Sequence, residues 1–266
     1  MFTHLHVHTE FSLLDGLCRV SQLISKANDL GMNTLAITDH GNMHGVINFY
    51  SIAKNAGIKP IIGCEMYLAE TSHLNKTISE KSTYHLTVLV KNLQGYRNLL
   101  QLTTKAHLDG FYYKPRIDKD LLIKHGEGLI LLSGCAQGQI PRLILEGRTS
   151  DAEKVALWHR ENFAHYYLEI QRHPIPELER INQGMLELSA KFDIPVVATN
   201  DVHYVNREDA SIHEILLCIQ TNTTILDDKR LKLAGDSFYL KSPEEMTGLF
   251  ADLPQAIENT EKIADL

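Results

Sequence analysis

The sequence of 266 residues contains no apolar run long enough to cross a membrane, since a spanning helix needs about 20 consecutive apolar residues. No basic segment followed by an apolar one is found at its start, so no signal peptide is expected and a cytoplasmic location is the default. The four cysteines are widely spaced and form no C-x-x-C pair, which argues against a disulfide framework. A phosphate-binding glycine loop and a G-x-S-x-G elbow are also missing. NTP-dependent and serine-based chemistry therefore has no support.

An excess of positive charge is missing as well. The formal net charge is −7, from 26 Lys and Arg against 33 Asp and Glu. This balance argues against broad nonspecific binding of nucleic acid through a basic face, but it leaves open a local site where bound cations reverse the sign. The abundant residue type is histidine, with 14 copies. We therefore expect part of the molecule to use imidazole chemistry.

Short β-type runs alternate with amphipathic helical patterns along the chain. One helical pattern begins at Ser21, a potential N-cap, and ends at Gly31. Repeated strand–helix units predict a parallel α/β sheet, and seven units fit an open sheet or a closed barrel. Residues 72–84 and 107–127 are predicted to be loops, and the chain from about 206 onward to be mostly helical. The predicted strands are residues 3–9, 33–40, 59–70, 85–91, 128–135, 165–171 and 194–204.

Five predicted strands end in side-chain types that bind metals, in the sequences "HLHVHT", "TDH", "GCE", "SGC" and "NDVH". The carboxyl ends of parallel strands meet at one edge of the fold, where functional groups gather. His6 and His8 share one face of their strand, about 7 Å apart along it, and Asp201 and His203 repeat this spacing. Imidazoles suit Zn, Mn or Fe, and a thiolate from Cys135 favours Zn. The sequence therefore predicts a metal site at these strand ends.

The ordered set "HLHVHTEFSLLDG", "LAITDHGNMHG", "KPIIGCEMY", "YHLTVLVKN", "FYYKPRID", "LILLSGC" and "ATNDVHY" resembles the polymerase and histidinol phosphatase (PHP) domain of bacterial DNA polymerase III alpha subunits. The resemblance covers essentially the whole chain. It implies an α/β fold that is a distorted seven-stranded (β/α) barrel, with its metal site at the C-terminal ends of the strands. The barrel would occupy about residues 1–220, followed by a helical segment over about 221–266. The chain would then be the N-terminal part of a longer polymerase.

The same resemblance implies a centre of two to three divalent ions, Zn, Mn or Fe. His85 begins its predicted strand instead of ending it, so its role depends on the resemblance alone, with His107 as the alternative. Asp201, His203 and Glu65 would be the catalytic members. The implied ligands are His6, His8, Glu65 and Asp201 for one ion, Glu65, His85 and Cys135 for the second, and Asp15, His40 and His203 for the third.

Clustered divalent ions suit phosphoester hydrolysis, because they lower the pKa of a bound water and stabilise charge on the reacting oxygens. The resemblance implies a proofreading 3′→5′ exonuclease whose partners are a DNA 3′ end and the rest of the polymerase chain. Two alternatives stay open: a small-molecule phosphatase similar to histidinol phosphatase, and a silent module that docks a separate proofreading exonuclease. The complete ligand set favours an enzyme. Tyr112, Tyr113, Lys114 and Arg116 are predicted to contact the DNA.

Overall fold

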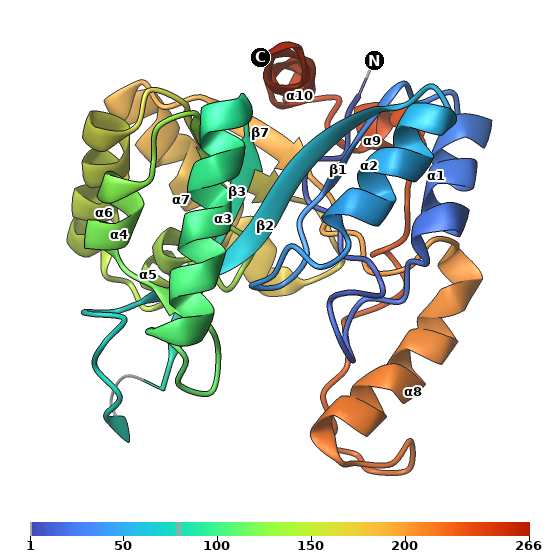
Figure 1. Ribbon diagram of the computed structural model, residues 1–266, viewed down its shortest axis with the longest axis horizontal. Coiled ribbons are helices and arrows are strands. Elements are labelled where there is room, and N and C mark those ends of the chain that lie inside the picture. Colours follow the sequence, from blue (N-terminus) through green and yellow to red (C-terminus); the bar gives the residue numbers. More distant parts are fainter. Residues whose placement is uncertain (1, 79–80) are drawn as a thin grey trace.

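The computed structural model describes residues 2–78 and 81–266. A curved sheet runs through the centre of the molecule, with the helices of residues 93–192 on one side and those of residues 20–55 and 210–221 on the other (Figure 1). The strands follow the spatial order β1-β2-β3-β5-β6-β7, and the two-residue β4 pairs with β2. Their bounds are β1 (Thr34–Ile37), β2 (Lys59–Ala69), β3 (Thr83–Val90), β4 (Arg116–Ile117), β5 (Leu129–Leu132), β6 (Tyr166–Gln171) and β7 (Val196–Thr199).

The predicted first strand, residues 3–9, forms no regular ladder and lies between the two edges of this sheet. On one side its carbonyls at His4 and Val7 accept hydrogen bonds from the backbone of residues 36 and 38, at and just beyond β1. On the other side His6 and His8 exchange backbone hydrogen bonds with Val202, just beyond β7. The N-terminal segment therefore joins the two edges. The result is the distorted seven-stranded α/β barrel that the resemblance implied.

The direction of β3 differs from the prediction of an all-parallel sheet. β3 is antiparallel to both β2 and β5. The reason lies in the connection from β2, because residues 70–82 contain no α-helix among those described, and a parallel return normally requires a long crossover. As a consequence the start of β3, with His85 opposite Tyr67, lies at the same end as the C-terminal ends of the parallel strands.

Most predicted helices form, with some changes at their ends. Gly31 and Gly57 follow α1 and α2 with φ angles of +71° and +78°, which favour glycine. Arg19, and not Ser21, occupies the N-cap position of α1. The predicted loop 107–127 contains the short helix α4, capped by the side chain of Asp118. The helices are α1 (Val20–Asp29), α2 (Val46–Asn55), α3 (Leu93–Leu108), α4 (Lys119–Lys124), α5 (Gln139–Leu145), α6 (Thr149–Asn162), α7 (Pro176–Phe192), α8 (Ala210–Thr221), α9 (Pro243–Leu249) and α10 (Pro254–Asp265).

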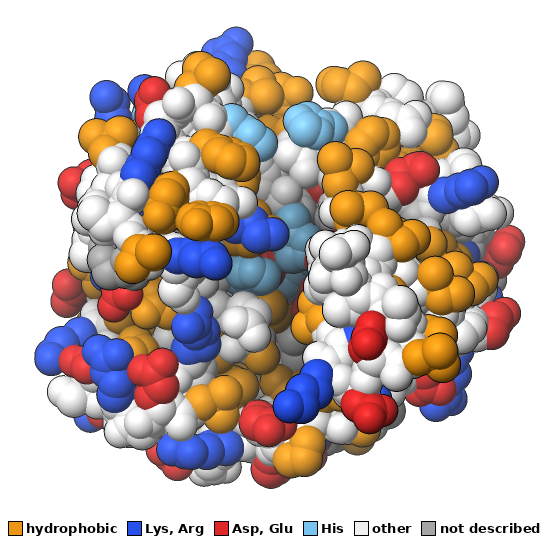
Figure 2. Space-filling view, turned by 90° about the horizontal axis from the view of Figure 1, so that it is seen from below, with side chains coloured by type: hydrophobic (Ala, Val, Ile, Leu, Met, Phe, Trp, Pro, Cys, Tyr) orange, Lys and Arg blue, Asp and Glu red, His pale blue; other side chains and the backbone are white. Residues whose placement is uncertain are grey.

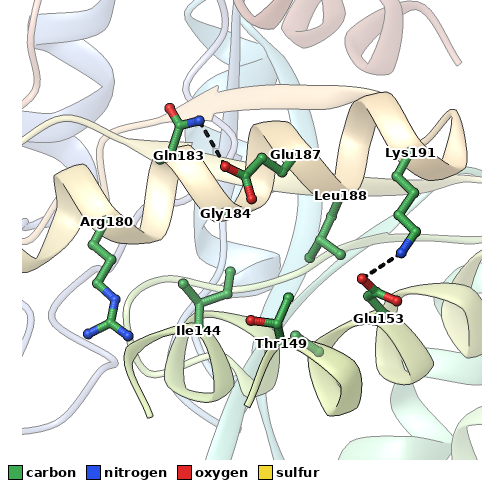
Figure 3. Close-up of a pocket in the computed structure, with 10 residues that line it drawn as sticks. Ile144, Thr149, Glu153, Arg180, Gln183, Gly184, Glu187, Leu188 and Lys191 are labelled. Atoms are coloured by element: carbon green, nitrogen blue, oxygen red, sulfur yellow. Dashed lines mark hydrogen bonds and ion pairs between the residues drawn. The ribbon is translucent and has the colours of Figure 1, made fainter. Parts of the chain in front are cut away.

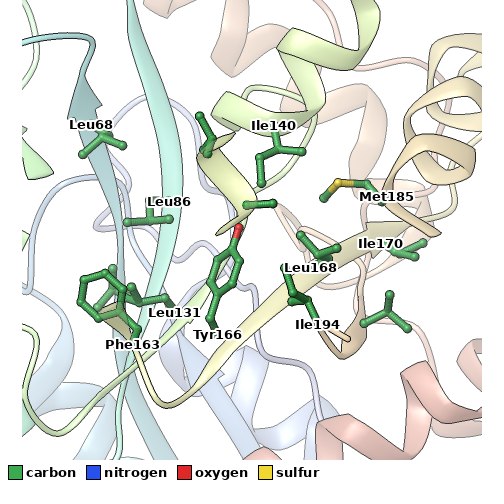
Figure 4. Close-up of a cluster of buried hydrophobic side chains, with 14 of the residues drawn as sticks. Leu68, Leu86, Leu131, Ile140, Phe163, Tyr166, Leu168, Ile170, Met185 and Ile194 are labelled. Carbon is green, nitrogen blue, oxygen red and sulfur yellow. The ribbon is translucent and has the colours of Figure 1, made fainter. Parts of the chain in front are cut away.

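Both faces of the sheet are buried, and for this reason its strands are nearly continuous runs of apolar residues. In β5, Leu131 belongs to the large cluster between the sheet and α3 to α7, part of which Figure 4 shows. Its neighbours Ile130 and Leu132 belong instead to a second cluster with residues of α10 such as Ile263. None of the described helices has the length and apolarity needed to span a membrane.

The last helix closes one end of the barrel. In α10, the Asn259 amide donates to the carbonyl of Val196 at the start of β7, and Thr260 Oγ1 accepts from the backbone N–H of Thr3. Lys59, the first residue of β2, donates to the carbonyl of Ala264. These contacts all lie at the N-terminal ends of parallel strands or of the first segment. The opposite end, where those strands finish, stays free for a site.

A buried histidine away from the site end of the barrel predicts that the fold loses stability in acid. His159 of α6 stacks on Tyr166 with ring centroids 4.8 Å apart, and burial lowers the pKa of His159 to about 4. An unfolded chain binds the proton near pH 6.5, so this residue should destabilise the fold as the pH falls from about 6.5 to 4. At pH 5 the cost is about 2 kcal/mol. Urea unfolding at pH 7 and pH 5 should show a smaller acid loss in His159→Phe than in the wild type, and equal losses would contradict this.

Candidate metal centre

All nine predicted ligands form one connected cluster at the end of the barrel opposite α10. His6 and His8 come from the N-terminal segment, Glu65 from β2, and His85 from the start of β3. The others come from loops: Asp15 follows the N-terminal segment, and each remaining ligand follows a strand within a few residues. These remaining ligands are His40 after β1, Cys135 after β5, and Asp201 and His203 after β7.

The first group contains His6, His8, Glu65 and Asp201. The Nε2 atoms of His6 and His8 lie 3.1 Å apart. Asp201 Oδ1 lies 3.2 Å from each of these nitrogens. The two oxygens of Glu65 lie 3.3 Å from His6 Nε2 and 3.5 Å from His8 Nε2. Two imidazoles and two carboxylates thus point at one shared volume.

Glu65 also belongs to the second group, with His85 and Cys135. Its Oε1 lies 2.9 Å from His85 Nδ1 and 3.6 Å from the Cys135 sulfur. The sulfur lies 3.5 Å from the same imidazole nitrogen. The carboxylate of Glu65 is therefore placed to bridge the first and second groups. The alternative ligand His107 instead donates a hydrogen bond from Nε2 to the carbonyl of Gly41.

The third group contains Asp15, His40 and His203. Asp15 Oδ2 lies 2.7 Å from His40 Nε2 and 3.7 Å from His203 Nε2. The other nitrogen of His40 lies 2.7 Å from Glu65 Oε2, which connects this group to the other two. The three groups therefore share a continuous set of nitrogen, oxygen and sulfur atoms.

The cluster fits divalent cations better than it fits a hydrogen-bonded core. His40 Nδ1, Glu65 Oε2 and Asp201 Oδ1 are buried without a hydrogen-bond partner of acceptable geometry among the described residues. Unpaired polar atoms in a protein interior are costly. Three sets of potential ligand atoms each fall within 4.8 Å of one another, namely His8, His40 and His203; His6, His8 and Asp201; and His40, Glu65 and His85. Bound cations would satisfy all of these atoms.

The ligand side chains differ in their protonation states before a cation binds. Burial, together with the neighbouring His40 and His203, lowers the pKa of His8 to about 3, so this imidazole is neutral. Burial alone would lower the pKa of His40, but the carboxylates of Glu65 and Asp15 raise it to about 10. Burial raises the pKa of the Cys135 thiol well above its ordinary range. Cation binding would therefore displace protons from His40 and Cys135.

Glu169 of β6 contacts the His6 ring nitrogen that faces away from the cluster. The sequence did not predict this role of Glu169. Its Oε1 lies 2.6 Å from His6 Nδ1 and accepts a hydrogen bond from Thr199 Oγ1 at 2.6 Å, while Thr87 Oγ1 donates to Oε2. The Nδ1–H of His6 therefore donates to this carboxylate, and the lone pair of Nε2 faces the cluster. The available signal was a single acidic residue in the otherwise apolar and aromatic run "YYLEI".

His8 has a similar support, built on Asp39 of the "TDH" sequence. The hydroxyl of Ser12 donates to Asp39 Oδ1 at 2.6 Å and lies 3.0 Å from His8 Nδ1. Asp39 Oδ1 also accepts from the backbone N–H of Thr9. Because Ser12 uses its proton on Asp39, it accepts from His8, which leaves the Nε2 lone pair of His8 free for the cluster.

The cluster lies at the base of a cleft of about 520 Å³. Figure 2 shows histidine side chains at the bottom of a hollow, with Lys and Arg side chains on one rim. Lys114, Arg142 and Tyr67 line the cleft, together with the apolar Leu231 and Leu233. The cleft thus joins the ligand cluster to cationic and apolar wall residues.

The predicted nucleic-acid contacts divide into two kinds. Lys114 is exposed at the cleft, and Tyr113 beside it is also exposed. Arg116 is fully buried, and its guanidinium donates to the carbonyls of residues 73, 75 and 110. The prediction that Arg116 contacts DNA is therefore corrected. Arg116 instead holds its loop together, with the half-buried Tyr112 ring 5.3 Å from its guanidinium carbon.

A different groove lies on the outer surface between α5, α6 and α7 (Figure 3), with a volume of about 330 Å³. Lys191 of α7 forms an ion pair with Glu153 of α6. Gln183 donates a hydrogen bond to Glu187, one turn along α7. These polar side chains already have partners, so the groove offers no comparable ligand set. Among the described residues, the candidate ligands therefore gather at the barrel end.

The PHP domain model matches residues 4–173. The chain belongs to the PHP domain family. It is 51% identical over 267 residues to the DNA polymerase III subunit alpha of Borreliella burgdorferi, and 47% identical over 268 residues to that of Treponema pallidum. Each match covers 99% of this chain and 23% of the relative. This PHP domain thus spans about a quarter of the length of these curated relatives.

Solved structures of lower similarity were also found. A Bifidobacterium adolescentis protein described as a metal-dependent phosphoesterase matches with a TM-score of 0.46 and 15% identity, over 76% of this chain and 87% of that one. A Chromobacterium violaceum amidohydrolase with bound sulfate and no metal matches with a TM-score of 0.46 and 13% identity, over 76% of this chain and 88% of that one.

Proposed function

We propose that this PHP domain is a metal-dependent phosphoesterase that removes nucleotides from a DNA 3′ end, as the 3′→5′ proofreading exonuclease of a DNA polymerase III alpha subunit. The observation that carries the proposal is the convergence of nine ligand side chains, connected through Glu65, at the base of an open cleft. The proposed ligands are the three groups described above, and the proposed cofactors are two to three Zn, Mn or Fe ions.

When bound, these cations would lower the pKa of a water molecule and stabilise charge on the phosphate. The side chains of the domain supply the rest. Glu65 and Asp201 keep their carboxylates ionised, since the surrounding histidines hold both pKa values below the ordinary range despite burial. His203 donates from Nδ1 to the carbonyl of Asp201, so its Nε2 faces the cleft. Glu65, Asp201 and His203 are the proposed catalytic residues.

Two features of the cleft support a nucleic-acid end over a small phosphate monoester. Lys114 and Arg142 offer cationic groups for more than one phosphate, and Leu231 and Leu233 offer an apolar surface for a base. The similarity to polymerase alpha subunits supports the same substrate and the remainder of such a chain as partner. A phosphatase similar to histidinol phosphatase is the second candidate, because it would use the same ligands. A module that docks a separate proofreading exonuclease is the third, and the intact ligand set argues against it.

Replacing Lys114 by Ala should lower kcat/KM about tenfold on a single-stranded oligonucleotide and leave hydrolysis of histidinol phosphate nearly unchanged. The reason is that a phosphate contact away from the scissile bond serves only a polymeric substrate, and its loss should also weaken the salt dependence of binding. The assay compares both substrates at two salt concentrations. Lys154→Ala, which removes an exposed lysine of α6 paired with Asp151, is the control.

Two results would replace the exonuclease proposal with the phosphatase. One is a large preference of the wild type for histidinol phosphate. The other is an unchanged kcat/KM of Lys114→Ala on the oligonucleotide. If the metal-loaded wild type hydrolyses neither the oligonucleotide nor histidinol phosphate, the result would instead favour the docking module.

A further inference from the structure

The segment 237–241, far along the chain from the family-model match, lies directly behind the loop that carries Asp201 and His203. The backbone N–H of His203 donates to the carbonyl of Phe238 at 2.8 Å, and the N–H of Leu240 donates to the carbonyl of Tyr204 at 3.2 Å. Tyr204 and Tyr239 form a parallel bridge. The segment therefore acts as a short extra strand against residues 203–204.

Asn200, the residue before the proposed ligand Asp201, makes three side-chain hydrogen bonds to segment 237–241. Asn200 is completely buried, and its amide donates to the carbonyls of Ser237 at 3.2 Å and Tyr239 at 2.8 Å. Its carbonyl oxygen accepts a hydrogen bond from Lys241 Nζ at 2.7 Å. Lys241 is itself buried and also donates to the carbonyl of Ser237. The Asn200 side chain is thus held at both of its polar atoms.

Asp201 needs such support because of its backbone. Its φ angle is +50°, in the left-handed region that non-glycine residues seldom adopt. This conformation accompanies the placement of Asp201 Oδ1 at 3.2 Å from the Nε2 atoms of both His6 and His8. A left-handed residue persists only where its surroundings fix it. The hydrogen bonds of Asn200 supply that constraint one residue away.

We propose that Lys241 is a positioning residue of the metal centre. Through Asn200, Lys241 holds Asp201 in its left-handed conformation and keeps the Asp201 carboxylate beside the Nε2 atoms of His6 and His8. A lysine serves here because its long stem crosses the buried space beneath the loop and its ammonium group donates to two acceptors at once. The inference rests on the proposed metal centre, and on no particular substrate.

Lys241→Met tests the proposal, because methionine keeps much of the length of the stem and loses every donor. The readout is titration of the metal-free protein with Mn²⁺ alone. We expect Mn²⁺ affinity at the tightest site to fall about 10-fold, the lower end of the effect of losing a direct outer partner of a metal ligand, because Lys241 acts through Asn200. With Co²⁺ as a probe, the thiolate absorption from Cys135 should persist, since the side chains of Cys135 and His85 contact each other and Glu65.

Lys262→Met is the matched control. Lys262 donates to Asn259 Oδ1 at 3.0 Å, so this variant removes a bond of the same type, but in α10 at the opposite end of the barrel. Its Mn²⁺ affinity should equal that of the wild type. If Lys241→Met does not fold, Asn200→Ser takes its place, because serine is too short to keep all three side-chain bonds.

A folded Lys241→Met or Asn200→Ser protein with Mn²⁺ affinity within twofold of the wild type would overturn the proposal. Equal losses of affinity in Lys241→Met and Lys262→Met would also overturn it, because they would indicate a general loss of stability. Failure of the wild type to bind Mn²⁺ would instead remove the metal centre on which the inference rests. The two failures are therefore distinguishable.

Discussion

Asp201→Asn is expected to reduce phosphoester hydrolysis about a thousandfold or more. The Asp201 carboxylate lies 3.2 Å from both His6 and His8 Nε2, and an amide offers neither its charge nor two equivalent oxygens to a cation. The loss of several kcal/mol of charge stabilisation corresponds to such a factor. Asparagine also tolerates the left-handed backbone, so the fold should remain intact. Single-turnover hydrolysis of an oligonucleotide by the metal-loaded variant measures the effect.

The matched control for this substitution is Asp252→Asn. Asp252 is an exposed aspartate that pairs with Arg172 outside the metal cleft, so its variant should hydrolyse the oligonucleotide like the wild type. Turnover by Asp201→Asn at the wild-type rate, with contaminating nucleases excluded, would rule out the assigned role of Asp201. Circular dichroism of both variants would show whether the fold is retained.

Removal of the metal ions is expected to lower the thermal midpoint by roughly 10 °C or more. A cation present at 100 times its Kd contributes about 3 kcal/mol to the free energy of unfolding at each site. For a chain of this size each kcal/mol shifts the midpoint by about 2–4 °C. Buried atoms of His40, Glu65 and Asp201 lack a well-aligned hydrogen-bond partner among the described residues, which explains why the metal-free protein should be less stable.

Thermal unfolding with and without a chelator, followed by return of Zn²⁺ or Mn²⁺, measures this shift. The midpoint should fall with the chelator and recover with the cation. A midpoint that the chelator leaves unchanged, in protein shown beforehand to contain metal, would mean that the ions lie outside the folded cluster.

The sequence predicted the parts of the site that depend on local periodicity. The pair His6 and His8 follows from alternation along extended chain. Asp201 and His203 reach the same end of the barrel by a different route, because β7 ends at Thr199 and Asp201 has a left-handed backbone. The role of Asp15 could be predicted only from the resemblance. Asp15 lies in a turn, and no sequence periodicity indicates that its Oδ2 lies 2.7 Å from His40 Nε2. The (β/α) barrel also needed it, since seven strand–helix units fit an open sheet equally well.

Features that depend on long-range pairing could not be predicted in this way. Strand periodicity is the same in both directions, so the sequence did not reveal that β3 is antiparallel and that His85 therefore reaches the ligand end. Glu169 looked like one polar position in a strand until its contact with His6 was seen. Arg116 looked exposed because charged residues usually are, whereas three backbone carbonyls satisfy it in the interior.

The central claim is that the nine-residue cluster is a polynuclear metal centre. Elemental analysis of the untagged protein, purified without chelator and with Zn²⁺, Mn²⁺ or Fe²⁺ supplied, tests it most directly. We predict about two to three ions for each folded chain, with fewer in Asp201→Asn analysed beside it. Less than one ion for each folded wild-type chain under all three supplies would contradict the claim.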